Sequence, residues 1–168
     1  MKHLNYLEVI SVATERLAKG QALLTVGGAH PNTMTIGWGS IGFCWGKPVF
    51  TVYVRPQRHT HDILREQGKF TVSIALTDDQ QAIFRMAGAT SGRDVDKFSG
   101  HGITAAPGQT IDAPVVAECQ LHFECVVLDE TRMLGETMDA GVRAHSYPQQ
   151  DYHTIYMGEI VDCYRTDI

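Results

Sequence analysis

The segment from Pro48 to Val54 constrains the fold of this chain more than any other stretch. Side chains of a strand alternate between its two faces, and here both faces are largely apolar, with Val49, Thr51 and Tyr53 on one and Phe50, Val52 and Val54 on the other. A strand with this pattern is buried on both sides. We therefore expect other parts of the protein to cover it from both faces.

Short strands dominate the rest of the sequence. Apolar stretches between glycines and prolines predict strands over 22–26, 33–38, 70–74, 119–128 and 152–164. Short helices are predicted over 11–19, 60–67 (capped by Thr60 and followed by Gly68) and 79–87, with one helical turn over 94–98. Residues 100–114 predict a loop, and 129–151 a connection or flap. This pattern indicates a mainly β protein, an antiparallel barrel with short peripheral helices, rather than a doubly wound sheet.

Size and charge narrow the range of functions. The 168 residues fit a single domain spanning 1–168. A net charge of −5 argues against a dedicated nucleic-acid binder, but it allows one local basic pocket for a phosphorylated small molecule.

No apolar run approaches the roughly 20 residues of a membrane helix, and the N-terminal segment lacks the apolar core of a signal peptide. We therefore expect a cytoplasmic protein without a membrane partner. The four cysteines form no C-x-x-C pair and are expected to be free, mostly buried thiols.

Residues 37–42 spell G-x-G-x-x-G. This motif binds a dinucleotide when a helix begins inside the glycines, so that the helix N-terminus meets the pyrophosphate. The residues that follow, Phe43 to Lys47, are poor helix formers, and a strand comes next. We therefore expect no Rossmann-type loop here, and interpret the glycines as a barrel corner where backbone or a flat ligand approaches closely.

A candidate anion site follows the central strand. Arg55 and Arg58 stand just before a predicted helix N-terminus, whose unpaired N–H groups carry partial positive charge. With the Thr60 hydroxyl they can hold a phosphate. The alternative is that both arginines pair with surface acids and Thr60 only caps the helix.

A second polar cluster covers residues 91–98. Ser91 can cap the predicted turn, and Arg93 and Lys97 can reach an anion. The alternative is a solvated helix start with local ion pairs.

The remaining motifs predict neither a metal site nor a catalytic nucleophile. His59 and His61 diverge if a helix begins between them, and on a strand His122 points away from the neighbouring cysteines, which does not suit a tetrahedral zinc ion. There is no G-x-S-x-G motif, and no cysteine has a basic neighbour that would activate it.

Asn32, Trp38 and Trp45 lie in or beside the glycine-rich corner. A flat aromatic ligand can stack on tryptophans in such a place. The alternative, which composition favours, is that both tryptophans belong to the core.

Several segments share an order and spacing with a known family. They are Asn32-Thr33-Met34-Thr35-Ile36-Gly37-Trp38-Gly39, Gly46-Lys47-Pro48, Arg55-Pro-x-Arg58-x-Thr60-His61, Gly68-x-Phe70-Thr71-Val72, Ser91-Gly92-Arg93-Asp94-Val95-Asp96-Lys97-Phe98, Ala113-Pro114-Val115, and Asp151-Tyr152-His153-Thr154 to Gly158-Glu159-Ile160. Through them the chain resembles the flavin reductase-like family of FMN-binding split barrels, and the flavoredoxin branch within it. The similarity runs over nearly the whole chain and is weakest between Met133 and Pro148.

The resemblance implies an antiparallel, Greek-key-like split β-barrel of six strands that forms a homodimer, with FMN at or near the dimer interface. It implies a wall along the isoalloxazine ring, a phosphate end and further cofactor contacts. The wall comprises Asn32, Thr33, Met34, Thr35, Trp38, Gly39 and Ser40. The phosphate end comprises Arg55, Arg58 and Thr60, and the further contacts are Ser91, Arg93, Lys97 and Tyr164.

The function implied is that of an FMN-dependent oxidoreductase. NAD(P)H reduces the flavin, which passes electrons to a second flavin, ferric iron or a protein, and the cofactor supplies the chemistry, so no catalytic residue is named. Two alternatives stay open. The first is an electron-transfer protein whose permanent FMN is reduced by a protein partner, and the second is a flavin-binding module with negligible turnover.

Overall fold

The central strand, β5 (Lys47–Val54), is buried as its two apolar faces require. In the computed structural model, which describes residues 1–166, Val49, Phe50, Val52 and Val54 are buried and Tyr53 is half-buried. β5 pairs with β10 (Thr154–Arg165) on one edge and with β4 (Gly39–Cys44) on the other. The prediction of a strand covered from both sides is therefore confirmed.

All pairings in the main sheet are antiparallel. The strands follow the order β3 (Asn32–Ile36), β2 (Ala22–Val26), β6 (Lys69–Ile74), β9 (Leu121–Arg132), β10, β5 and β4, and β1 (Lys2–His3) pairs with the far end of β10. A separate two-stranded sheet joins β7 (Ala105–Ala106) to β8 (Val115–Val116). The mainly β, antiparallel fold class is confirmed.

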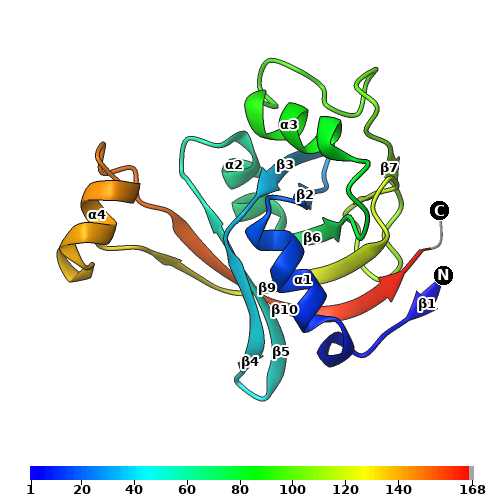
Figure 1. Ribbon diagram of the computed structural model, residues 1–168, viewed down its shortest axis with the longest axis horizontal. Coiled ribbons are helices and arrows are strands. Elements are labelled where there is room, and N and C mark those ends of the chain that lie inside the picture. The colour runs from blue at the N-terminus through cyan, green and yellow to red at the C-terminus, as the bar shows by residue number, and fades with distance from the viewer. Residues whose placement is uncertain (167–168) are drawn as a thin grey trace.

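Four short helices lie outside the sheet (Figure 1), namely α1 (Ile10–Ala18), α2 (His59–Gln67), α3 (Gln81–Ala89) and α4 (Ala140–Ser146). Two 3₁₀ turns, η1 (Tyr6–Glu8) and η2 (Gly135–Thr137), complete the elements found within residues 1–166. Figure 1 shows α4 on an extension that leads away from the barrel between β9 and β10. We call residues 133–151 the arm.

The apolar core fills the barrel between β2, β5, β6, β9 and β10, with α1 and α2 adding Leu17 and Leu64. A smaller cluster lies under α3. Among residues 1–166, no helix is long and apolar enough to cross a membrane.

Four local predictions are corrected by the structure. α2 begins one residue earlier than predicted and its N-cap is Arg58, so Thr60 lies inside the helix. Residues 94–98 form turns without a helix. The glycine-rich corner is in fact the strand β4, and the flap contains the helix α4.

The G-x-G-x-x-G segment leads into β4, and Phe43 to Lys47 form a strand end and a tight turn. The absence of a Rossmann-type helix at this segment is confirmed. Trp45 and Gly46 both have positive φ angles, +52° and +72°, as the central residues of a two-residue hairpin with the favoured twist require.

Candidate functional site

Two depressions adjoin along β3 and share Met34, Thr35 and Arg58. The first, which we call the inner pocket, has a volume of about 130 Å³ between β3, the start of α2 and the end of α3. The second, the β3 groove, has a volume of about 200 Å³ and runs from Met34 along β3 to Trp38 and His153. Together they form one continuous site with a small polar end and a longer half-apolar end.

Lys97 closes the inner pocket from within the protein. Its side chain is only 3% exposed, and its ammonium group donates to the carbonyl oxygens of Thr33 and Ala87, both at 2.8 Å. Burial, and next to it the positive charge of Arg58, lower the pKa of Lys97 to about 8. A lysine ammonium has three N–H donors, so the third remains for a ligand in the pocket.

Arg58 supplies the second positive charge of the inner pocket. It lies at the N-cap of α2, and no ion pair to it is found among the described residues. The lining contains no carboxylate, so the charges of Arg58 and Lys97 are not neutralised there. Two such cations at the start of a helix form a site for an anion.

Asn32 and Thr60 form the buried polar wall of this pocket. The Asn32 side-chain amide donates to the Thr60 hydroxyl at 2.8 Å. Both side chains are buried. The Thr60 hydroxyl therefore accepts one bond and keeps its proton for a second partner.

Arg55, predicted at the same anion site, has a different role. Its guanidinium forms an ion pair with Asp151 and donates to the Ser146 carbonyl at 3.1 Å, and it lies over the Tyr147 ring. Arg55 borders the β3 groove but not the inner pocket. Arg55 is therefore paired with an acid, which is the alternative given for it above. This ion pair joins the arm to the barrel.

Only some residues of the predicted isoalloxazine wall line the two depressions. Met34 and Thr35 line both depressions, and Trp38 lines the groove. Thr33 contributes its carbonyl to Lys97, while its hydroxyl bonds to Thr25 inside the sheet. Gly39 and Ser40 lie in β4 and line neither depression; a Cβ on Gly39 would approach Thr51 O to 2.9 Å, so this glycine serves packing.

Of the second polar cluster, Ser91 lines the inner pocket together with Lys97. Its hydroxyl accepts from the Arg93 N–H at 3.2 Å. The Arg93 guanidinium donates to Asp62 at 2.6 Å and to the Gln57 carbonyl at 2.8 Å. Arg93 therefore ties the cluster to α2 and lies outside the inner pocket.

Tyr164, another predicted cofactor contact, lies away from both depressions. It lies near the opposite end of β10 from the groove, is 1% exposed, and donates its hydroxyl to Glu124 at 2.8 Å. Glu124 in turn accepts from three backbone N–H groups of the loop at 109–111. The Tyr164 hydroxyl is thus bound to a buried carboxylate, and Tyr164 lines neither the inner pocket nor the β3 groove.

His153 borders the groove and was not singled out from the sequence. Its ring packs 5.0 Å from that of Trp38, and its Nδ1 is 2.8 Å from the Tyr147 hydroxyl. Burial, followed by the charges of Arg55 and Arg58, lowers the pKa of His153 to about 4, so the ring is neutral at neutral pH. His153 lies just before β10 and meets two arginines that are far away in the sequence. No local feature of the sequence predicts this position.

Composition suggested that both tryptophans belong to the core, but neither of them does. Trp38 is 48% exposed beside the groove, and Trp45 is 59% exposed at the tip of the β4–β5 hairpin with Phe43, which is 69% exposed. The four cysteines are free, and all but Cys44 are buried, as predicted.

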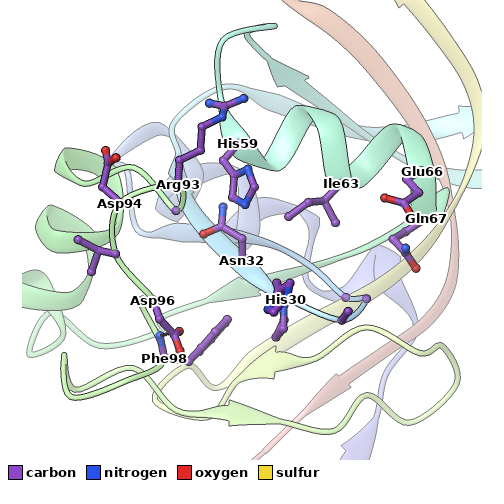
Figure 2. A pocket seen from close by; sticks show the side chains of 16 residues that line it. His30, Asn32, His59, Ile63, Glu66, Gln67, Arg93, Asp94, Asp96 and Phe98 are labelled. Atoms are coloured by element: carbon purple, nitrogen blue, oxygen red, sulfur yellow. Dashed lines mark hydrogen bonds between the residues drawn. The ribbon is translucent and has the colours of Figure 1, made fainter.

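A larger cavity of about 720 Å³ opens on the other side of Asn32 (Figure 2). It lies between the loop at 27–31, one face of α2 and the segment at 92–98. We call it the α2 cavity. Within residues 1–166, no group of three or more His, Cys, Asp or Glu side chains is placed to hold a metal ion.

Comparison with known proteins agrees with this fold. The model of the flavin reductase like domain matches residues 14–167. A ferric-chelate reductase (NAD(P)H) of Archaeoglobus fulgidus is 30% identical over 120 residues, which cover 67% of this chain and 71% of that protein.

Two solved structures are similar over most of the chain. The flavoredoxin of Desulfovibrio vulgaris (Miyazaki F) superposes with a TM-score of 0.68 at 26% identity, covering 87% of this chain and 69% of its own. An NADH:FAD oxidoreductase of Streptomyces globisporus superposes with a TM-score of 0.66 at 23% identity, covering 93% and 83%.

Proposed function

The chain belongs to the flavin reductase-like domain family, and from this premise we propose that it binds FMN along β3 and passes electrons from NAD(P)H, through the flavin, to an acceptor. The phosphate lies in the inner pocket and the isoalloxazine ring along the β3 groove. The acceptor is a second flavin, a ferric complex or a redox protein.

The observation that carries this proposal is the pair of unneutralised cations in the inner pocket. The whole chain is acidic, with a net charge of −5, yet the inner pocket brings Arg58 and Lys97 together without a carboxylate. Holding two like charges near one another is costly unless an anion joins them. A phosphate ester fits because it accepts several charge-assisted hydrogen bonds at once.

The residues present suit a flavin, whose ring supplies two-electron transfer when it is bound. Arg58 and the free N–H of Lys97 bind and orient the phosphate. Thr35 and Met34 connect the two depressions, and Trp38 shields the groove from water. His153, neutral and held by Tyr147, presents a polar ring to the groove without adding a charge.

The relatives support the choice of reductant. The ferric-chelate reductase carries NAD(P)H in its name, and the Streptomyces protein is an NADH:FAD oxidoreductase. Both names describe electron flow from a nicotinamide to a flavin or to iron. We propose the same direction of flow here.

We further propose that the protein acts as a homodimer. Phe43 and Trp45 at the hairpin tip, and Trp38 at the groove, leave large apolar side chains exposed, and exposed apolar surface of this kind marks contact sites. A second copy of the chain that covers the hairpin and the open side of the groove buries these side chains.

Anaerobic stopped-flow mixing of the FMN-loaded protein with NADH and with NADPH tests the proposed function. Bleaching of the oxidised flavin spectrum by either nucleotide, faster than that of free FMN, is the expected result. Reduction by a redox protein but by neither nucleotide would instead select the electron-transfer alternative.

A further inference from the structure

A further pocket lies between the arm and the barrel, and we call it the arm pocket. It has a volume of about 410 Å³, within the roughly 300–1,000 Å³ that is usual for ligand pockets. One wall comes from α1 and one from the arm, and a third includes Gly37, Trp38 and Tyr53. The same three residues also line the β3 groove. The arm pocket and the groove are therefore neighbours.

The lining of the arm pocket, as far as residues 1–166 form it, carries no charge at neutral pH. The rings of Trp38 and Tyr147 meet edge to face there, with centroids 6.3 Å apart. Arg55 lies over the Tyr147 ring, but its guanidinium is paired with Asp151. A ligand with a phosphate, a carboxylate or a metal ion would lose hydration in this pocket without gaining a counter-charge. The pocket therefore suits an uncharged, flat molecule.

Three hydroxyl groups give the arm pocket its capacity for hydrogen bonds. They belong to Thr14, Tyr53 and Ser146, and within residues 1–166 none of them bonds to another side chain or to the backbone. The Tyr147 hydroxyl, by contrast, is held by His153 at 2.8 Å. A hydroxyl without a partner can donate to a carbonyl oxygen. We therefore expect the ligand to carry carbonyl oxygens on an otherwise apolar ring.

Two methionines make the arm side of this pocket adaptable. Met133 and Met138 are half-buried in the lining, and a flexible thioether packs well against the edge of an aromatic ring. Both belong to the arm, where the resemblance to the family is weakest. The ligand of the arm pocket is therefore a property of this chain rather than of the family.

We propose that the arm pocket binds a small uncharged quinone and that the protein reduces it to the hydroquinone. This rests on the proposed function, which lays the flavin ring along the adjacent β3 groove and takes electrons from NAD(P)H. Over one cycle a C–H bond of the dihydronicotinamide ring breaks and releases a hydride, which carries two electrons and one proton. The quinone takes up these two electrons and two protons, the second from solvent. Its two C=O groups become C–OH, NAD(P)⁺ is left, and the flavin ends as it began.

Binding of menadione, an uncharged naphthoquinone, to the flavin-free full chain tests the pocket independently of the flavin. Trp45→Phe leaves Trp38 as the only tryptophan, and menadione should quench its fluorescence to a plateau. A naphthoquinone sulfonate, which adds a negative charge to the same rings, should bind about tenfold more weakly or worse. Quenching that does not saturate, or equal binding of the two quinones, overturns the proposal.

Val142→Glu places a carboxylate in the lining from α4, where Val142 is 50% exposed. This variant should bind menadione about tenfold more weakly and FMN unchanged. Leu134→Glu is the matched control, since Leu134 is 53% exposed on the arm and does not line the pocket. An equal loss in the two variants overturns the proposal, because the effect then comes from the charge of the arm and not from the pocket.

The hydroxyl groups are tested by Thr14→Val combined with Ser146→Ala. This double variant should weaken menadione severalfold but leave methylnaphthalene, which has the rings without the carbonyl oxygens, unaffected. A loss for both ligands contradicts the proposed hydrogen bonds and overturns the choice of a quinone.

Turnover is tested with the FMN-loaded protein. Menadione should accelerate the oxidation of NAD(P)H by the unmodified protein and by Leu134→Glu, and less so by Val142→Glu. Bound menadione that stays oxidised while NAD(P)H reduces the flavin overturns the proposal. Displacement of menadione by NAD⁺ also overturns it, because the pocket then serves the nicotinamide. A protein that binds menadione but takes up no FMN would instead overturn the proposed function.

Discussion

Burial of the Lys97 ammonium group lowers the stability of the fold but provides the pocket with a cation. A buried ammonium group is stable only when its donors are satisfied, and two of them bond to the carbonyls of Thr33 and Ala87. Those carbonyls belong to β3 and α3, so Lys97 also joins the strand to the helix. The third donor and the nearby Arg58 leave the pocket short of negative charge, which a bound phosphate supplies.

We predict that Arg58→Gln weakens FMN binding by about 10- to 150-fold, because a hydrogen bond to a charged group contributes roughly 1.5–3 kcal/mol. Riboflavin, which has no phosphate, should bind the variant and the unmodified protein alike. Arg65→Gln is the matched control, since Arg65 lies exposed on α2, pairs with Glu130 and lines neither depression. Fluorescence titrations with both flavins measure the effect. An Arg65→Gln loss as large as that of Arg58→Gln would contradict the assignment.

We predict that FMN affinity falls at alkaline pH. The pKa of Lys97 is lowered to about 8 in the free protein, and only the protonated amine binds a phosphate. Affinity should therefore be constant below pH 8 and fall by up to about tenfold per pH unit above it. Titrations between pH 6.5 and about 9.5 check this. The Lys97→Met variant should bind FMN weakly, with an affinity that no longer falls as the pH rises. If its affinity still falls above pH 8, another group is responsible for the titration.

At the scale of elements, apolar alternation predicted the strands well. Residues 22–26 form β2 as predicted, and the other expected strands are found within a few residues of their predicted ends. β4 was missed because its two glycines weaken the strand pattern, although Ile41 and Phe43 do alternate and Trp45-Gly46 marks a hairpin turn. α4 was missed because it is short, although Asp139 caps it by accepting from Val142 N–H.

Long-range pairing limited the prediction of the site. Nothing local distinguishes Arg55 from Arg58, since the distinction depends on Asp151, which lies 96 residues after Arg55. His153 and Trp38 are also far apart in the sequence, and their rings come into contact only in the folded chain. The absence of a Rossmann loop at the glycine-rich motif could be predicted because its neighbours could be judged locally, whereas the strand β4 in place of a barrel corner could not.

The arm is held to the barrel by a few polar contacts of Arg55 and Tyr147. We predict that Arg55→Gln exposes the arm to proteases, because it removes a half-buried ion pair and a hydrogen bond to Ser146. A loss of about 1–2 kcal/mol in local stability increases the open population roughly 5- to 30-fold. Limited proteolysis with mass spectrometry should show faster cleavage within 133–151 and an unchanged pattern in the barrel. Cleavage at the unmodified rate would show that the ion pair does not hold the arm.

At the scale of the whole molecule, the strands build a barrel, and the site lies at its surface beside the exposed Trp38. We predict a homodimer, so sedimentation equilibrium at micromolar concentration should give twice the 18.6 kDa of one chain. Phe43→Ser with Trp45→Ser should shift the equilibrium toward monomer, because large apolar side chains dominate such contacts. A single species of one chain mass in the unmodified protein would contradict this.

The central claim is that the protein holds a flavin by its phosphate, and gel filtration after incubation with excess FMN tests it most directly. The account predicts that the protein peak is yellow, carries about one FMN per chain, and loses the flavin when Arg58→Gln and Lys97→Met are combined. A folded, unmodified protein that elutes colourless after the same incubation would contradict the account.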